Sequence, residues 1–225
     1  MNKDLIEKKE LSFVSRQEAA GQAEDFLSEL DIGCEPSTPQ IIALDGNDLN
    51  RIQEQIMQDE EYRDILNAKN LGDMSFDEGM EIYFLEYSFT LDDIHVFGKD
   101  DPAIQSSGED PLAAQNMGAT FIISRSGMER VFLEGLVAPL PERSDKIDMI
   151  DYNGIKEALE KKFGDVILTE EYRITNIWLE YFPLIRKDSF YEVDIVPVWC
   201  CDFEIDGESD AYTLRFHGLT GEEIR

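Results

Sequence analysis

Acidic side chains gather in one short stretch near the end of the chain, where they could bind a cation. Asp202, Glu204 and Asp206 alternate along a predicted strand and therefore share one face, while Glu208 and Asp210 follow across a predicted hairpin. Calcium prefers such oxygen ligands, but the spacing does not match the Asp-x-Asp-x-Asp-Gly loop with its distant Glu. The pattern therefore favours a solvated face of mutually repelling carboxylates, with weak calcium binding as an alternative.

Histidine and cysteine, the other residues that commonly bind metals, are sparse. His95 and His217 are too few and too isolated for a zinc site, and we expect an exposed turn residue and a surface or hydrogen-bonded residue, respectively. Cys34, Cys200 and Cys201 do not make a disulfide framework. Adjacent cysteines in a strand face opposite sides, so the last two are not expected to bond each other, and all three are predicted to be small, buried or half-buried residues.

Charge and motifs narrow the class of function. The chain has 225 residues, with 49 acidic and 20 basic side chains and a net charge of −29. Such a charge repels phosphate backbones and anionic lipid heads, so no nucleic-acid partner is expected. No phosphate-binding loop, dinucleotide fingerprint or serine-nucleophile elbow is present. We therefore predict a protein that is not an enzyme, with no catalytic, cofactor-binding or metal-binding residues and no cofactor.

A hydrolase remains the alternative from a different class. Paired carboxylates in a groove between two units could act as acid and base, provided that both face a cleft and their pKa values are separated. The large excess of Asp and Glu motivates this reading, but no pair of acids stands out from the sequence.

Three helical segments are expected in the first third of the chain. Ser15 and Glu18 form a capping box, and apolar residues at helical spacing extend the first helix from about Arg16 to Asp31. A Pro-rich connector and a short apolar run at 41–44 come next. A cap at 45–47 then begins a second helix, and the acidic stretch 59–67 continues as helix. The apolar residues of the second helix are Leu49, Ile52, Ile56 and Met57.

Strands dominate the middle of the chain. Residues 80–90 are rich in aromatic and aliphatic side chains and predict a strand, with a turn at Asp92-Asp93 and a return strand at 94–97. Gly98 to Gly118 predicts a long exposed loop, and long loops are often functional or mobile. A hairpin around Gly127 then joins strands at 119–124 and 128–137.

The second half predicts a helix followed by three antiparallel strands. A linker at 138–148 leads to a helix capped by Asn153. Asp206-Gly207 is a strong hairpin signal, and Pro197 predicts a bulge or a sheet edge. The predicted strands are Arg173–Ile185, Tyr191–Ile205 and Ala211–His217. A helix packed on an antiparallel meander gives an α+β fold.

An internal repeat connects the two halves. Phe84-Leu-Glu-Tyr87 and Trp178-Leu-Glu-Tyr181 each open a strand-rich block that follows an amphipathic helix. The repeat predicts two related units, 11–140 and 150–225, each with an N-terminal helix packed on an antiparallel meander sheet. The first unit carries an extra helical region and the long loop. We also expect Tyr181 to pair across strands with an aromatic residue such as Phe203.

The second unit resembles a known kind of domain. Its helix at 155–163 is followed by Ile177-Trp-Leu-Glu-Tyr-Phe-Pro183, by Val196-Pro-Val-Trp199 and by a last strand that runs into Gly218-Leu-Thr-Gly-Glu222. This order is similar to the PepSY-like modules and the YycI-type regulatory proteins of Gram-positive bacteria. The whole chain resembles two-unit lipoproteins of Clostridia.

The resemblance implies an exported protein that binds or restrains a partner without catalysis. It implies an extracytoplasmic protein held on the outer face of the membrane. The attachment to the membrane would be only through a lipid anchor or signal segment that this chain does not show. The partner expected from it is a cell-envelope protein. The contact surfaces expected are a concave sheet face or the loop at 98–118.

Overall fold

The chain forms two compact units, each described here by itself. The computed structural model describes residues 9–69, 75–96, 117–140, 148–164, 171–185, 192–205 and 211–224. The first unit comprises Met1–Leu30, Thr38–Tyr87 and Ala119–Leu133, and the second comprises Asp31–Ser37, Ser88–Gly118 and Glu134–Arg225. The second unit thus takes in Asp31–Ser37, Ser88–Gly118 and the stretch 134–140, which the predicted range 11–140 assigns to the first unit.

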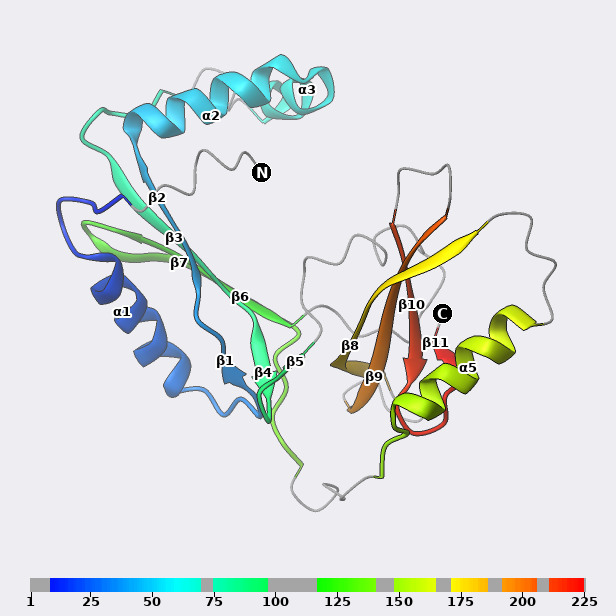
Figure 1. Ribbon diagram of the computed structural model, residues 1–225. Coiled ribbons are helices and arrows are strands. Elements are labelled where there is room, and N and C mark those ends of the chain that lie inside the picture. The colour runs from blue at the N-terminus through cyan, green and yellow to red at the C-terminus, as the bar shows by residue number, and fades with distance from the viewer. Residues whose placement is uncertain are drawn as a thin grey trace. The chain divides into compact units, whose positions relative to one another are not determined.

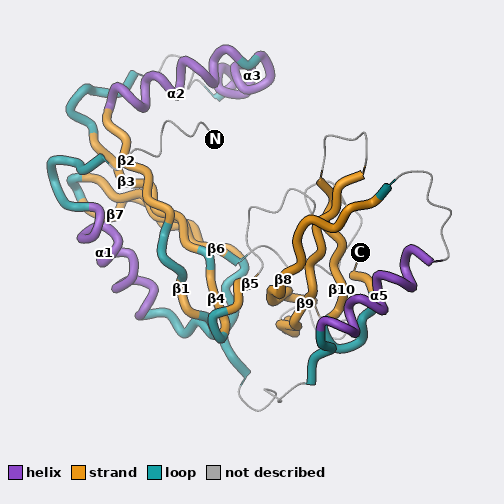
Figure 2. Tube along the Cα trace, viewed as in Figure 1, coloured by secondary structure: helices purple, strands orange, loops and turns teal. Residues whose placement is uncertain are grey.

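Helices and largely antiparallel sheets together confirm the predicted α+β class (Figures 1 and 2). The described helices are α1 (Arg16–Ser28), α2 (Gly46–Gln58), α3 (Glu60–Ala68) and α5 (Tyr152–Gly164). One sheet has the order β2-β3-β6-β7, with strands β2 (Gln40–Asp45), β3 (Glu81–Tyr87), β6 (Gly118–Ser124) and β7 (Gly127–Glu134). The other has the order β1-β4-β5-β8-β9-β10-β11, with strands β1 (Glu35–Pro36), β4 (Phe89–Leu91), β5 (Ile94–Val96), β8 (Tyr172–Ile185), β9 (Val193–Ile205), β10 (Ala211–His217) and β11 (Glu223–Ile224).

In the first unit α1 covers one face of the sheet. Alternate residues of β3 are buried, as expected for a strand whose one face packs on a helix. The Tyr87 hydroxyl donates to the carbonyl of Ala20 at 3.2 Å, and the ring of Phe121 meets that of Phe26 edge-on, with 5.8 Å between centroids. The predicted capping box at Ser15 is confirmed, but α1 ends at Ser28, three residues before the predicted end.

In the second unit α5 packs on one face of the meander β8-β9-β10, which is antiparallel as predicted. Ile155 and Leu159 of α5 share a buried cluster with Cys201 and Phe216. The opposite face of the same strands forms a separate cluster around Phe182, Val198 and Cys200. The central strand β9 therefore has a buried face on each side.

Two details of this unit differ from the predictions. Asp151 caps α5 instead of Asn153, because its Oδ1 accepts from the backbone N–H of Gly154 at 3.0 Å. The predicted pair of Tyr181 with Phe203 is wrong: Tyr181 lies opposite Pro197, and Phe203 lies opposite Ile174 and Tyr212. The register of the strands decides such pairs, and spacing along one strand does not reveal it.

Pro197 lies inside β9, the strand between β8 and β10, and not at the predicted bulge or sheet edge. It pairs with β8 on one side, but β10 ends opposite Val198, so Pro197 has no ladder partner on the β10 side. Its carbonyl accepts from the N–H of Gly218 at 2.7 Å. The missing N–H of proline is therefore tolerated here.

The two copies of aromatic-Leu-Glu-Tyr lie on β3 and β8. In both strands the Leu and Tyr share the face that packs on a helix, and the aromatic residue and Glu share the other face. The sheets around them differ in strand order, and the second also contains β1, β4 and β5 from the first half of the chain. Duplication of a whole unit therefore stays a prediction.

Gly46, the first residue of α2, has a neighbour that leaves no room for a side chain. A Cβ there would overlap the Asp77 carbonyl oxygen and lie 2.7 Å from the carbonyl carbon, whereas a Cβ at Gly21 in α1 would meet nothing within 4 Å. Gly46→Ala should therefore destabilise the fold by about 1–3 kcal/mol, as overpacking does. The matched Gly21→Ala should stabilise it by about 0.5–1 kcal/mol because the helix interior prefers Ala. Urea unfolding followed by circular dichroism measures both; equal shifts would contradict the close crossing.

Candidate protein-binding surface

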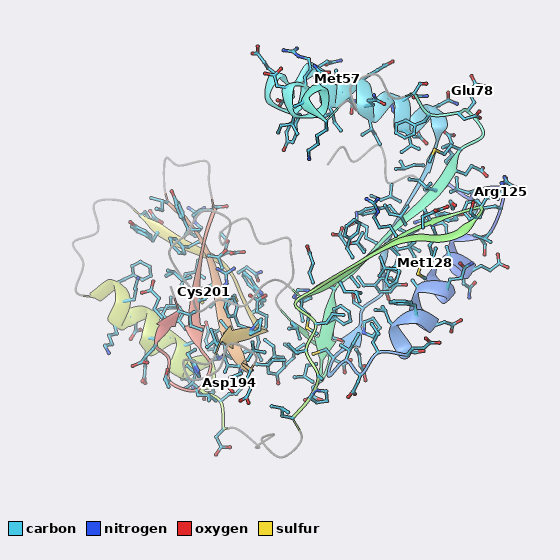
Figure 3. All side chains as sticks on the ribbon, turned by 180° about the vertical axis from the view of Figure 1, so that it is seen from behind. Met57, Glu78, Arg125, Met128, Asp194 and Cys201 are labelled. Atoms are coloured by element: carbon cyan, nitrogen blue, oxygen red, sulfur yellow. The ribbon has the colours of Figure 1, made fainter. Side chains whose placement is uncertain are left out.

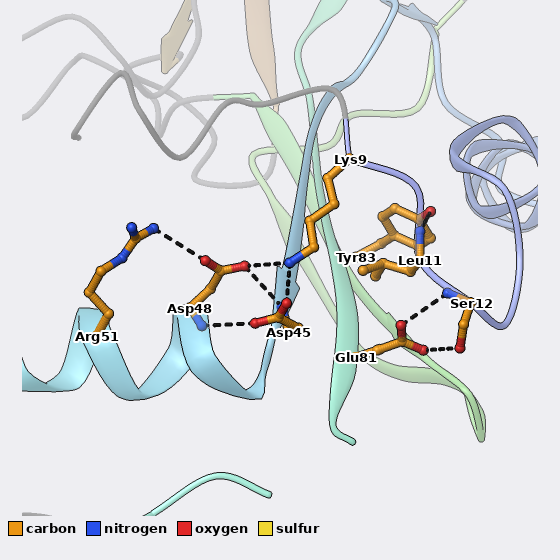
Figure 4. Close-up of polar contacts among 8 residues, drawn as sticks. All are labelled: Lys9, Leu11, Ser12, Asp45, Asp48, Arg51, Glu81 and Tyr83. Carbon is orange, nitrogen blue, oxygen red and sulfur yellow. Dashed lines mark hydrogen bonds and ion pairs between the residues drawn. The ribbon is translucent and has the colours of Figure 1, made fainter. Parts of the chain in front are cut away.

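The first turn of α2 is anchored by charge. Asp45 caps the helix, and Asp45 and Asp48 form a capping box in which each side chain accepts from the other's backbone N–H. The Lys9 ammonium binds the Asp45 carboxylate and, at 2.9 Å, that of Asp48 (Figure 4). Burial lowers the Lys9 pKa, but the hydrogen bonds to both carboxylates outweigh it and the pKa is raised overall. The hydrogen bond from Lys9 lowers the pKa of Asp45, so the Lys9–Asp45 pair is charged at neutral pH.

A second anchor holds α2 to the segment before β3. The Asn50 side chain accepts from the backbone N–H of Phe76 at 2.8 Å and donates to the Phe76 carbonyl at 3.0 Å. The backbone of Asp77 crosses Gly46 one turn earlier. Two contacts one turn apart fix the direction of the helix axis as well as its position.

The segment before α1 is tied to the same end of the sheet. The Tyr83 hydroxyl accepts from the N–H of Leu11 at 2.8 Å and lies 3.0 Å from the carbonyl of Val14 (Figure 4 shows the first pair). Glu81 accepts from the Ser12 hydroxyl at 2.6 Å and from its N–H at 3.0 Å, and the hydroxyl bond lowers the pKa of Glu81. These bonds place Lys9 beside the cap of α2.

Beyond its first turn α2 leaves the sheet, and α3 follows it. Figure 1 shows the two helices continuing from the end of β2 and covering neither face of the sheet. Gly46 is the buried residue of α2, and no described side chain of α3 is buried. Figure 3 shows Met57 on this helix pair, remote from the β6–β7 turn that carries Arg125.

An apolar stripe on this helix pair is partly exposed. We define the α2–α3 surface by six side chains at helical spacing, of which three are exposed and three half-buried. Ile56 is 38% exposed, Tyr62 59% and Ile65 45%. The half-buried members are Leu49, Ile52 and Met57. An amphipathic helix normally packs such a stripe against its own core; here Ile56, Tyr62 and Ile65 each keep more than a third of their surface exposed.

A buried charged group lies in the second unit, on the sheet face opposite α5. Glu180 and Arg215 are 6% and 7% exposed, and the Arg215 Nε lies 3.7 Å from Glu180 Oε1. The Cys200 thiol, opposite Arg215 in the ladder, donates to the same oxygen at 2.9 Å. Burial lowers the pKa of Arg215 and raises that of Cys200. A thiol held protonated in this way is a poor nucleophile.

The residues singled out for metal chemistry are dispersed. His95 is exposed on β5, and His217 is half-buried with its Nδ1 accepting from the N–H of Leu219 at 3.2 Å. Asp202 accepts from the Thr213 hydroxyl at 2.6 Å, and Glu204 is exposed. The remaining acids of that hairpin, 206–210, and most of the loop 98–118 lie outside the described residues. Within the described part of the chain, no group of three or more His, Cys, Asp or Glu could hold a metal ion.

Cysteines behave as the sequence predicts. All three are free and buried. Cys200 and Cys201 lie in the separate clusters on opposite faces of β9, which keeps their sulfur atoms apart. Burial raises the pKa of Cys34, and it raises that of Cys201 to about 11.

Sequence reasoning found the helices of the candidate surface but not the surface itself. The apolar spacing of Leu49, Ile52 and Ile56 predicts an amphipathic helix, and a helix of this kind is first assumed to pack on its own core. The available signal was the density of carboxylates in the following segment, 59–64, which favours solvent on one side. No feature of the sequence around Glu180 and Arg215 indicates that these two charged residues are buried together.

Comparison with known proteins gives one structural likeness. No protein-family model and no curated protein matches the chain. Its structure is similar to the crystal structure of an uncharacterised protein from Eubacterium rectale ATCC 33656, with a TM-score of 0.50, 17% identity, and coverage of 99% of this chain and 59% of that one. The chain thus spans about three-fifths of that protein's length. At this identity the likeness supports the fold alone.

Removing one member of the buried pair should be costly. Glu180→Leu leaves the Arg215 charge without its carboxylate and should lower the free energy of unfolding by about 3–5 kcal/mol. The double variant Glu180→Leu/Arg215→Met removes both charges and should recover a large part of that loss, because a buried pair contributes little net stability. Urea titration of the three proteins tests this. Additive losses in the double variant would show that the two groups are not coupled.

Alkaline pH should weaken the fold through its thiols. Between about pH 9 and 11 the unfolded chain loses the Cys201 proton, whose ordinary pKa is 9.0, while the folded chain with its pKa of about 11 retains it. The folded state then binds more protons, so stability falls as pH rises through this window. The Tyr87 hydroxyl, with its pKa raised to about 12 by burial, adds to the fall at higher pH.

The measurement is the urea midpoint as a function of pH. Cys201→Ala should flatten the fall between pH 9 and 11 without changing the midpoint trend at neutral pH. Native protein at pH 8 should also react with a thiol reagent much more slowly than urea-unfolded protein. Equal reaction rates in the two states would contradict the burial of the three thiols.

Proposed function

We propose that this chain is a non-catalytic binding or regulatory module that works outside the cytoplasm, attached to the outer face of a membrane, with a cell-envelope protein as its partner. The observation that carries the proposal is the α2–α3 surface. Apolar side chains are exposed there on helices whose anchors, among the described contacts, lie at the first turns of α2. Contiguous exposed apolar side chains of this kind mark interaction sites.

Energetics support a partner for this surface. Fully burying one large aliphatic or aromatic side chain contributes about 1.5–3 kcal/mol. Ile56, Tyr62 and Ile65 are 38%, 59% and 45% exposed, so burying the exposed remainder on a partner offers about 2–4 kcal/mol before the entropic cost of association is subtracted. That range suits a reversible, regulatory contact.

Preorganisation adds to the argument. Lys9, Gly46 and Asn50 hold the start of α2 before any partner arrives. A partner then meets a helix whose direction is already set, so less ordering entropy is lost on binding. A flexible segment carrying the same side chains would bind more weakly.

The compartment is supported by the resemblance to PepSY-like and YycI-type proteins. Those proteins are exported or membrane-tethered and restrain partners. No helix in the described part of the chain is both long and apolar enough to cross a bilayer. The proposed attachment is through a lipid anchor or signal segment.

Affinity capture tests the proposed surface. The wild-type chain, Ile65→Gln and Ile174→Gln would each be immobilised and exposed to detergent-treated envelope from the cells that make the protein. Ile65 and Ile174 are both 45% exposed, so the two substitutions remove equal apolar exposure from different units. The expected result is a partner retained by wild type and Ile174→Gln and lost with Ile65→Gln.

The outcomes separate the surface from the rest of the molecule. Circular dichroism confirms first that both variants keep the helix content of wild type. Retention of the same partner by Ile65→Gln, or its loss with Ile174→Gln, would place binding elsewhere. If the detergent-treated envelope yields no specific partner, the proposal of a binding module is contradicted.

A further inference from the structure

We infer that the α2–α3 surface binds a cationic amphipathic helix of its partner. The inference rests on the proposed function and adds the chemistry of the partner. Two features of the surface carry it: an exposed apolar stripe at helical spacing and an excess of carboxylates around that stripe.

Charge around the stripe is strongly one-sided. The segment Gly46–Lys69 carries Asp48, Glu54, Asp59, Glu60, Glu61 and Asp64 against Arg51, Arg63 and Lys69. The acidic side chains at 54, 59, 60 and 64 are exposed. Asp77 and Glu78, which lie on the segment that anchors α2, are exposed as well. A partner with lysines or arginines beside its apolar face complements this charge.

One ion pair beside the stripe is exposed to solvent. Arg63 lies 3.5 Å from Glu60, whose side chain is 87% exposed. An exposed pair of this kind contributes little and exchanges readily, so an incoming cation can displace it. Asp48, in contrast, is held by Lys9 and Arg51 in the cap of α2.

A helix is the partner element that fits the stripe. The apolar residues recur every three or four positions along α2 and again along α3, which is the spacing that helix-against-helix packing uses. Recognition of an amphipathic helix by an apolar surface is a recurrent binding mode, read through anchors at the same spacing. The 13 residues of α2 span about 20 Å, the length of a partner helix of four turns.

Charge excludes the two other obvious occupants. A second copy would bring a net charge of −29 against the same charge, which opposes self-association. A membrane surface attracts helices rich in Lys and Arg on their polar side. This helix pair has twice as many carboxylates as cations, so an anionic bilayer repels it.

The test uses three synthetic helical peptides that share one leucine face and differ in their polar face, which carries Lys, Gln or Glu. Each peptide has about 18 residues, enough for five turns of helix. Fluorescence anisotropy measures their binding to the full chain at low and at physiological salt. The Lys peptide should bind at least about tenfold more tightly than the Gln peptide at low salt, and the difference should shrink as salt screens the charges.

Two sets of variants assign the binding to this surface. Glu60→Gln/Asp64→Asn on α3 should weaken the Lys peptide about three- to tenfold, consistent with loss of two rim charges. The matched Glu157→Gln/Glu160→Gln on α5 removes the same charge, and each pair of substitutions breaks one surface ion pair. It should leave binding within twofold of wild type. Ile65→Gln should weaken all peptides, and Ile174→Gln none.

Each contrary outcome would overturn a specific part of the proposed interaction. Equal binding of the Lys and Gln peptides, or no effect of salt, would reject the cationic partner. If Ile65→Gln still weakened binding in that case, the proposed protein-binding surface would stand. Loss of binding with the α5 variant as large as with the α3 variant would show general attraction to an acidic protein. Self-association in sedimentation, or binding to vesicles of phosphatidylglycerol in preference to the Lys peptide, would identify a different occupant.

Discussion

The close crossing of the Asp77 backbone over Gly46 is the constraint on which the proposed surface depends. Because glycine has no side chain, the segment before β3 can touch the first turn of α2, and Asn50 then joins both polar groups of Phe76. Lys9 pairs with both carboxylates of the cap next to this crossing. The helix leaves the sheet in one direction, and its apolar side chains stay half-buried or, at Ile56, exposed.

The second unit has to bury both faces of its central strand. Its central strand β9 buries a face on each side, so one face takes α5 and the other holds Glu180, Cys200 and Arg215 among apolar residues. Pairing of the two charges and a thiol hydrogen bond to the same carboxylate reduce the cost of burying them. This arrangement makes the thiol inert and favours a structural role for the cluster over chemistry.

Acidity and apolar exposure act together at the α2–α3 surface. A charge of −29 on each copy opposes self-association through the partly exposed apolar stripe. The same charge speeds the approach of a cationic partner and selects against neutral or acidic ones. Affinity would then come from the side chains Ile56, Tyr62 and Ile65, and selectivity from the carboxylates beside them.

Local signals in the sequence determined the elements of this protein, because capping and side-chain periodicity act over a few residues. The Ser15 capping box, the α2 helix, the three-stranded meander and the opposite faces of Cys200 and Cys201 follow from them. Tertiary structure alone decided which elements meet. It brought β1, β4 and β5 into the second sheet, set the register that separates Tyr181 from Phe203, and left α2 and α3 uncovered among the described residues. Periodicity shows which side chains share a face, but what covers that face depends on contacts distant in the chain.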